Sequence, residues 1–246
     1  MNLDELNHVI KQKPSLEFGS IFSRSIDLFQ KVWVQGFITL LLTLVTIIPF
    51  YVMIYIPLIA AGITDPEMLR SEDPPAIVII SMVVLFPIVM IGIMTFNLAL
   101  QAAFFRICKQ KDMGLIANDD YFYYFKDGRL GKILTLSLIM IGLSILGALA
   151  CGIGIIYLVV PMSLFPVFLA FNEELSAMEM VKSSFALGNK NWLVIFGLLI
   201  VMGFIAELGV ILCFVGVLFT AMLAKIPTYF IYKDGVGFSD TDINNL

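Results

Sequence analysis

The feature of the sequence that most constrains its fold is a set of long apolar segments. They cover residues 33–63, 77–105, 133–171, 192–212 and 216–231. A transmembrane helix needs about 20 apolar residues at a rise of about 1.5 Å per residue. The segment 133–171 is long enough for two such helices, and Cys151-Gly152-Ile153-Gly154 offers a turn between them. The sequence therefore predicts an all-α membrane protein with six transmembrane helices.

The composition supports an integral membrane protein and argues against nucleic acid as a partner. Hydrophobic residues make up 60% of the 246 residues, and charged residues only 14%. A soluble domain has roughly 25% charged residues, because its surface must face water. The formal net charge is −4, whereas binding to nucleic acid requires an excess of positive charge. We expect residues 1–246 to form a single membrane domain that is surrounded by lipids.

The distribution of basic residues predicts the orientation in the membrane. Fourteen of the fifteen Lys and Arg residues fall on the same side of the predicted transmembrane helices, and Arg70 alone falls on the other side. Short segments rich in Lys and Arg remain in the cytoplasm. The sequence therefore predicts a multi-pass membrane protein with cytoplasmic N- and C-termini.

An internal repeat divides the chain into three units. Residues 25–33 and 184–192 share the pattern Ser-x-x-Leu-x-x-Lys-x-Trp, and each leads into an apolar segment. Residues 125–132 hold the same place in the middle unit, and residues 151–157 resemble residues 213–219 at the outer turns. Each unit then consists of a cytoplasmic amphipathic helix followed by a helical hairpin. All three hairpins enter the membrane from the cytoplasmic side. The sequence predicts three parallel helical-hairpin repeats, over about residues 17–114, 119–172 and 176–237.

The predicted cytoplasmic helices combine one apolar face with one polar face. Apolar side chains recur at helical spacing over residues 17–33. In the third unit, Ser176 and Glu179 have the spacing of a capping box. Trp33 and Trp192 are expected to lie at the membrane interface. These helices either only frame the transmembrane helices or form a collar that docks another protein.

Two pairs of adjacent acidic residues and one glycine are interpreted as helix signals. Asp119 with Asp120, and Glu173 with Glu174, precede predicted amphipathic helices, so we expect N-caps rather than general acid–base pairs. Gly188 is a typical helix stop at the end of the third amphipathic helix.

No catalytic residue, cofactor site or metal site is predicted. His8 is the only histidine, so neither a Ser-His-Asp triad nor a site with several histidines can be built. Cys108, Cys151 and Cys213 are too scattered for a disulfide framework or a metal site. The protein is expected not to be an enzyme.

Three polar residues inside apolar segments are candidate binding residues. Asn97 and Gln101 are four positions apart and share one helix face, and Glu207 lies in the outer half of the fifth predicted helix. Such groups either bond to a neighbouring helix or line a path for a substrate. Two alternatives follow: a polar pocket near Asn97, Gln101 and Glu207, or helix–helix contacts with Glu207 near the outer surface.

Several motifs in the C-terminal half resemble a known family. They are residues 174–179, Ser184-Phe185-x-Leu187-Gly188-Asn189-x-x-Trp192, Cys213-x-x-Gly216-x-x-Phe219 and Tyr232-Lys233-Asp234-Gly235. Over about residues 120–237 the chain is similar to the YciC-like proteins and to the membrane domain fused to some glycerophosphodiester phosphodiesterases. The resemblance implies a six-span protein of the bacterial inner membrane. The phosphodiesterase is a separate soluble barrel without a counterpart in these 246 residues, so the resemblance implies no catalytic residue.

Three classes of function therefore remain. The first is a non-enzymatic subunit or scaffold of an inner-membrane assembly that handles protein export, envelope biogenesis or lipids, with other inner-membrane proteins as partners. The alternative is a small transporter or lipid-binding protein that uses the polar pocket. An intramembrane enzyme is the least favoured class.

Overall fold

The computed structural model describes residues 3–60, 76–115, 117–126, 128–150, 152–211 and 215–238. Within these ranges the regular structure is entirely helical. The helices are α1 (Leu3–Gln12), α2 (Phe18–Ala60), α3 (Ala76–Asp112), η2 (Tyr123–Phe125), α4 (Leu130–Leu149), α5 (Ile153–Ser163), α6 (Phe165–Phe171), α7 (Ala177–Lys190), α8 (Trp192–Glu207), η3 (Leu208–Ile211), α9 (Val215–Thr220), η4 (Ala221–Ala224) and α10 (Ile226–Gly235).

Five helical stretches among the described residues are long and apolar enough to cross a membrane. They are Phe18–Ala60, Val78–Asp112, Leu130–Leu149, Ile153–Phe171 and Trp192–Val210. The protein is therefore a multi-pass membrane protein, as the apolar segments predict. The sixth predicted transmembrane helix, residues 216–231, is divided among α9, η4 and α10, so it does not form one continuous helix.

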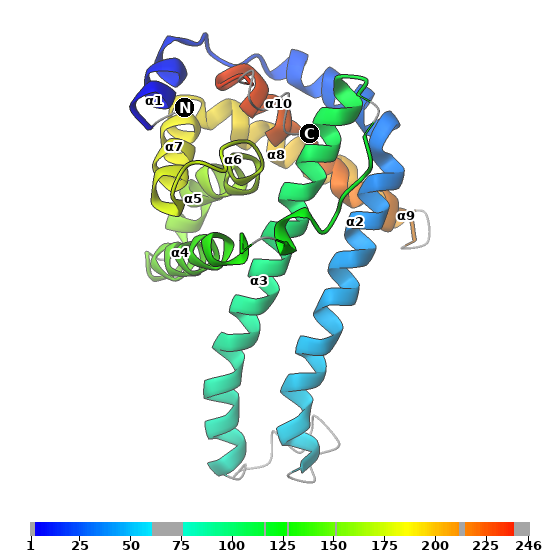
Figure 1. Ribbon diagram of the computed structural model, residues 1–246, viewed down its shortest axis with the longest axis vertical. Helices are drawn as coiled ribbons and strands as arrows, with labels where there is room; N and C mark the ends of the chain where they lie inside the picture. The colour runs from blue at the N-terminus through cyan, green and yellow to red at the C-terminus, as the bar shows by residue number, and fades with distance from the viewer. Residues whose placement is uncertain are drawn as a thin grey trace.

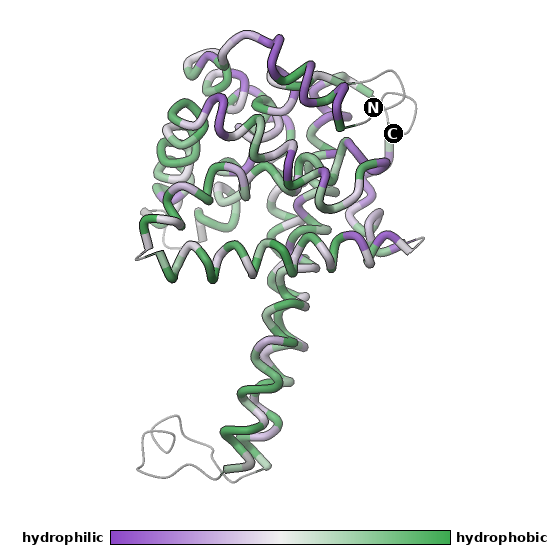
Figure 2. Tube along the Cα trace, turned by 90° about the vertical axis from the view of Figure 1, so that its left-hand side faces the viewer, coloured by the Kyte–Doolittle hydropathy of each residue, from purple (hydrophilic) through white to green (hydrophobic). Residues whose placement is uncertain are grey.

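Helices α2 and α3 form a long hairpin that extends away from the other helices (Figure 1). The predicted amphipathic helix and the first transmembrane helix are one continuous helix, because α2 runs for 43 residues through Pro49 and Pro57. In the extended part, large apolar side chains point outward: Val45 is 59% exposed and Val83 is 68% exposed. Figure 2 shows that this part of the hairpin is almost uniformly hydrophobic. An unpartnered apolar surface of this kind suits hydrocarbon rather than water.

The remaining helices form a compact body around the C-terminal half of α3. Within it, α4 and α5 make a second hairpin, whose turn contains Gly152 with a φ of 78°. The third hairpin comprises α8, η3, α9 and η4. Figures 1 and 2 together show that α4 lies across the long axis of the α2–α3 hairpin, not along it. The chain turns at Gly152, inside the segment predicted to separate the two helices, and the direction of the second hairpin is a new finding.

The core of the body is rich in aromatic residues. All seven residues of α6 are buried, and so are Tyr229, Phe230 and Tyr232 of α10. Phe168 and Phe171 pack against Tyr232, with ring centroids 5.2 Å apart in both pairs. This packing brings α10 to the inside of the body, next to the end of α3.

Two predictions about helix ends can be compared directly with α7. The capping box is confirmed, because the Ser176 hydroxyl accepts the Glu179 backbone N–H and the Glu179 carboxylate accepts the Ser176 backbone N–H. The helix stop at Gly188 is wrong, since α7 continues to Lys190. A Cβ at Gly188 would lie 3.2 Å from the Cα of Pro161, so this glycine lets α5 approach α7.

The predicted N-caps and the middle amphipathic helix need correction. Residues 117–126 form a loop with the short helix η2, in which Asp120 accepts the Phe122 backbone N–H at 3.1 Å. Asp119 instead accepts a hydrogen bond from Gln35 at 3.1 Å. The cap of α7 is Ser176, and Glu173 forms ion pairs. Acidic residues before a helix are N-caps only when the first turn starts at the next residues.

The structure also describes one of the three cysteines and the N-terminal segment. Cys108 is a buried free thiol in α3. Cys151 and Cys213 lie outside the described residues, so the predictions on them remain predictions. The N-terminal segment, which lies before the first predicted amphipathic helix, forms α1, which buries Leu6 and Ile10.

Candidate functional site

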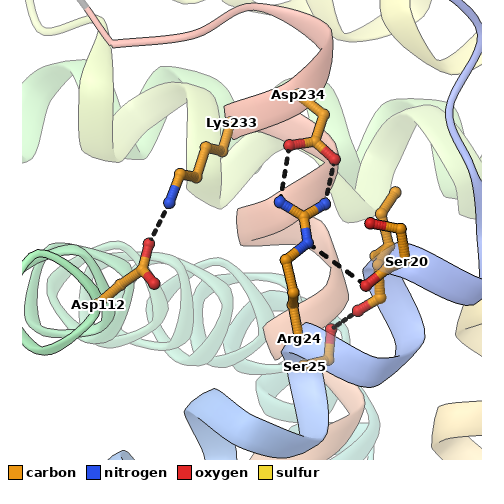
Figure 3. A network of polar contacts seen from close by, with 7 residues as sticks. Ser20, Arg24, Ser25, Asp112, Lys233 and Asp234 are labelled. Carbon is orange, nitrogen blue, oxygen red and sulfur yellow. Dashed lines mark hydrogen bonds and ion pairs between the residues drawn. The ribbon is translucent and has the colours of Figure 1, made fainter.

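A group of connected polar side chains lies where α10 meets α2 and α3. Lys233 and Asp234 are consecutive on α10 but pair with different helices (Figure 3). The Lys233 ammonium lies 2.5 Å from a carboxylate oxygen of Asp112, at the end of α3. The guanidinium of Arg24, on α2, donates two hydrogen bonds to the two Asp234 oxygens, one of them at 3.1 Å. We call Arg24, Asp112, Lys233 and Asp234 the α10 cluster.

The α10 cluster is supported by aromatic rings and backbone groups. The Tyr229 hydroxyl donates to Asp112 at 2.7 Å. Arg24 lies over the ring of Phe230, 4.7 Å from its centroid, and its Nε donates to the Ser20 carbonyl at 3.3 Å. Each charge in the cluster therefore has an opposite charge, and Arg24 and Asp112 each have a further contact that orients the side chain.

A second group of charges surrounds Glu173, in the loop after α6. Its carboxylate pairs with Arg106 of α3 at 3.3 Å and with Arg129 at 3.4 Å. Lys132 of α4 donates to the Glu173 backbone carbonyl. The Tyr123 ring lies against both guanidinium groups, at 3.7 Å from Arg106 and 4.3 Å from Arg129. We call Arg106, Arg129, Lys132 and Glu173 the Glu173 cluster.

A small cavity of about 50 Å³ adjoins the Glu173 cluster. It is lined by Tyr124, Arg129, Lys132, Leu169 and Glu173. This volume holds a few water molecules at most, because each needs roughly 10–15 Å³ on the same measure. Burial raises the pKa of the Tyr123 and Tyr124 hydroxyls, so both are neutral donors at physiological pH.

The two clusters are joined by a hydrogen bond between their sequence neighbours. Tyr232, next to Lys233, donates to the side-chain oxygen of Asn172, next to Glu173, at 2.8 Å. The connected groups link α2, α3, α4, α6 and α10 at one end of the body. In the α10 cluster the paired side chains are between 17% and 36% exposed, so solvent screening limits each pair to roughly 1 kcal/mol. The arrangement is suited to holding helix ends together.

The three residues of the predicted polar pocket occupy two different helices. Gln101 donates a hydrogen bond to Asn97 within α3, so this pair satisfies part of its own hydrogen-bonding capacity. Glu207 is the last residue of α8, and its side chain is exposed. A pocket shared by all three residues remains a prediction.

The two tryptophans predicted to lie at the membrane interface have different surroundings. Trp33 is 45% exposed and lies near Phe219 of α9, with ring centroids 6.1 Å apart. Trp192 begins α8, stacks on Phe196 and donates its indole N–H to the Tyr157 carbonyl at 3.1 Å. Trp192 therefore also connects α8 to α5.

Sequence reasoning did not find the α10 cluster or the Glu173 cluster. It assigned the basic residues to topology and interpreted Glu173 as an N-cap. The available signal was the Tyr232-Lys233-Asp234-Gly235 motif, in which two opposite charges follow a buried aromatic residue. Gly235 completes this motif because it allows α10 to pack closely on α7. A Cβ at this position would lie 2.5 Å from the Leu187 side chain of α7.

Comparisons with known proteins do not extend this description. No family model, no curated protein and no solved structure matches the chain. Within the described ranges, no group of three or more His, Cys, Asp and Glu residues is placed to hold a metal ion.

Proposed function

We propose that this protein is a non-enzymatic subunit or scaffold of an assembly in the bacterial inner membrane. The assembly would handle protein export, envelope biogenesis or lipids, and the partners would be other inner-membrane proteins. One observation carries the proposal. The α2–α3 hairpin extends beyond the body with apolar side chains exposed along both helices, such as Val45 and Val83.

The hairpin has the properties of a docking element for transmembrane helices. Its two helices pack on each other through Phe50 and Phe96, whose ring centroids are 5.7 Å apart. In the extended part of the hairpin, large apolar side chains such as Val45 and Val83 are exposed and accessible to another membrane protein. At the base, Arg24 on α2 and Asp112 on α3 are both tied to α10. A rigid base with an extended hairpin would present the same surface to a partner at all times, which lowers the entropic cost of association.

The membrane arrangement is part of the proposal. We place six spans in three parallel hairpin repeats, with both termini in the cytoplasm and the loop containing Arg70 outside. The fourteen basic residues on the same side support this orientation. Membership of the YciC-like family is proposed on the motifs of residues 174–235.

Site-specific photocrosslinking in living cells tests the function. A photoreactive phenylalanine analogue would replace Val45 or Val83 on the hairpin, or Leu193 on α8, which is 78% exposed. We expect a discrete protein adduct from the two hairpin positions and none from Leu193, because only the hairpin extends beyond the body. Adducts with lipid alone from both hairpin positions would contradict a scaffold that docks through this element.

A further inference from the structure

A groove of about 490 Å³ lies between α1 and α7. It is lined by Asn7, Ile10, Lys11, Lys182, Ala186 and Lys190. Its volume falls within the range of small-molecule sites, which is roughly 300–1,000 Å³. In Figure 1 both helices lie at the end of the molecule opposite the tip of the α2–α3 hairpin. Under the proposed topology the groove opens on the cytoplasmic side.

Lys190 holds the two walls of the groove together. Its ammonium donates to the backbone carbonyls of Ile10 at 2.7 Å, Lys11 at 3.2 Å and Lys13 at 2.5 Å. These carbonyls belong to the C-terminal end of α1, which carries partial negative charge and is satisfied by a cation. The α1 side chains Leu6 and Ile10 are buried below this contact. The groove is therefore a built feature and not a gap between two independent helices.

Lys11 and Lys182 bring two positive charges to the groove. Both side chains are exposed, and neither forms an ion pair with a described residue. Glu179, one turn before Lys182, does not line the groove. Its carboxylate accepts hydrogen bonds from the Ser176 hydroxyl and backbone N–H, and the nearby Lys182 charge contributes less to lowering its pKa than these hydrogen bonds do. Two ammonium groups on facing helices favour an anion between them.

Asn7 provides a hydrogen-bonding group of a different kind. Its side-chain oxygen is buried and has no hydrogen-bond partner in the described chain. A buried acceptor without a donor is costly. The Asn7 residue lines the groove, so rotation of its amide would let this oxygen accept a hydrogen bond from a ligand hydroxyl. Ile10 and Ala186 add a small apolar wall.

We propose that the groove between α1 and α7 binds a phosphate ester that carries hydroxyl groups. Lys11 and Lys182 bind the phosphate, and Asn7 accepts a hydrogen bond from a hydroxyl of the ligand. The same chemistry occurs in a soluble polyol phosphate and in the phosphoglycerol headgroup of an anionic lipid. This site is separate from the hairpin surface of the proposed function, so either proposal can fail alone.

Calorimetric titration of the full chain, in nanodiscs made of phosphatidylcholine only, tests the chemistry. We expect glycerol 3-phosphate to bind and glycerol not to bind, because the lysines need the phosphate. Propyl phosphate, which lacks the hydroxyls, should bind about fivefold more weakly for the loss of one hydrogen bond. Absence of any binding by glycerol 3-phosphate, together with absence of retained anionic lipid in the experiment below, would overturn the proposal.

Substitutions assign the binding to the groove. The double variant K11Q/K182Q should bind glycerol 3-phosphate at least about tenfold more weakly, since two charge-assisted contacts are lost. The control K31Q/K126Q removes the same charge from exposed positions outside the groove and should bind as the parent does. N7A should bind glycerol 3-phosphate only as strongly as the parent protein binds propyl phosphate. Equal weakening in K11Q/K182Q and K31Q/K126Q would indicate nonspecific attraction and reject the site.

A second set of nanodiscs, containing phosphatidylglycerol, distinguishes the two sources of ligand. If the lipid headgroup occupies the groove, native mass spectrometry will show phosphatidylglycerol retained by the parent and lost in K11Q/K182Q, and glycerol 3-phosphate will bind more weakly. If the ligand is soluble, glycerol 3-phosphate will bind equally in both kinds of nanodisc. Circular dichroism confirms that each variant is folded, and the single variant K182Q serves if the double variant is not.

Discussion

Gly154 of α5 packs directly on Gly147 of α4, so that the backbones of the second hairpin touch. A Cβ added at Gly154 would lie 2.8 Å from the Cα of Gly147 and 2.9 Å from its carbonyl oxygen. Both contacts involve backbone atoms, which cannot move without separating the helices. Small residues at such crossings allow close approach in membrane proteins.

This contact predicts opposite effects for two glycine substitutions. Gly154→Ala should destabilise the protein by roughly 1–3 kcal/mol, the usual cost of overpacking. Gly142→Ala is the matched control on α4, because a Cβ there meets nothing within 4 Å. Alanine in a helix interior is favoured over glycine, so the control should be neutral or more stable by about 0.5–1 kcal/mol. Thermal unfolding in detergent measures both, and equal behaviour of the two variants would contradict the close crossing.

The pair between Arg24 and Asp234 predicts a measurable coupling between the two ends of the chain. Arg24→Gln, Asp234→Asn and the double variant form a double-mutant cycle. We expect a coupling free energy of roughly 0.5–1 kcal/mol, because the pair is bidentate but about one-third exposed. The Lys126–Asp120 pair, with Lys126 58% exposed, should give a smaller value and serves as the control. A coupling of zero for Arg24 and Asp234 would show that the α10 cluster does not hold α2.

The capping box of α7 predicts a loss of stability on substitution and on acidification. Ser176→Ala should cost about 1 kcal/mol, since the first turn loses its side-chain acceptor. The Ser176 hydroxyl and backbone N–H lower the pKa of Glu179. The carboxylate therefore contributes stability above its pKa in the unfolded chain, and this contribution disappears as the pH falls through its lowered pKa in the folded protein. Glu179→Gln should flatten that part of the stability–pH profile, whereas Glu17→Gln, at an exposed position before α2, should leave it in place.

The sequence was sufficient for the five long apolar helices but not for their directions or for the divided sixth segment. The apolar runs predict α2, α3, α4, α5 and α8, because length and composition alone decide whether a helix suits a membrane. They carry no information on tilt, and α4 lies across the α2–α3 hairpin. The continuity of α2 is not evident from the sequence, because the pattern changes from amphipathic to apolar near residue 33, which favours two helices over one. Packing against α3 and the body overrides these local signals.

The candidate site was less predictable than the fold because its contacts are long-range. Arg24 and Asp234 are 210 positions apart, and Tyr229 and Asp112 are 117 apart. A single sequence gives the charges of these residues but not their partners. The capping box was predictable for the opposite reason, since all of its contacts lie within four consecutive residues.

Cysteine accessibility tests the proposed orientation. In a variant without Cys108, Cys151 and Cys213, single cysteines would replace Ser71, Lys111 or Lys182. In intact spheroplasts we expect a membrane-impermeant maleimide to label the cysteine at position 71 and not those at positions 111 and 182, because the basic residues place the latter two in the cytoplasm. Permeabilised cells are the control, in which exposed Lys182→Cys must also react. Labelling in the opposite sense would invert the topology.

The last prediction concerns Glu207, which separates the proposed scaffold from the alternative transporter. Glu207 is exposed at the end of α8. An acid that only reaches water or headgroups has no role that depends on its charge, so Glu207→Gln should fold normally and support crosslinking from Val83 as the parent does. A carboxylate in a transport path would instead be needed in its ionisable form. Growth of a strain that carries only the variant, compared with a Glu17→Gln control at an exposed position before α2, provides the functional measurement. A folded Glu207→Gln variant that fails to support growth while it still crosslinks would favour the transporter and place its site at the end of α8.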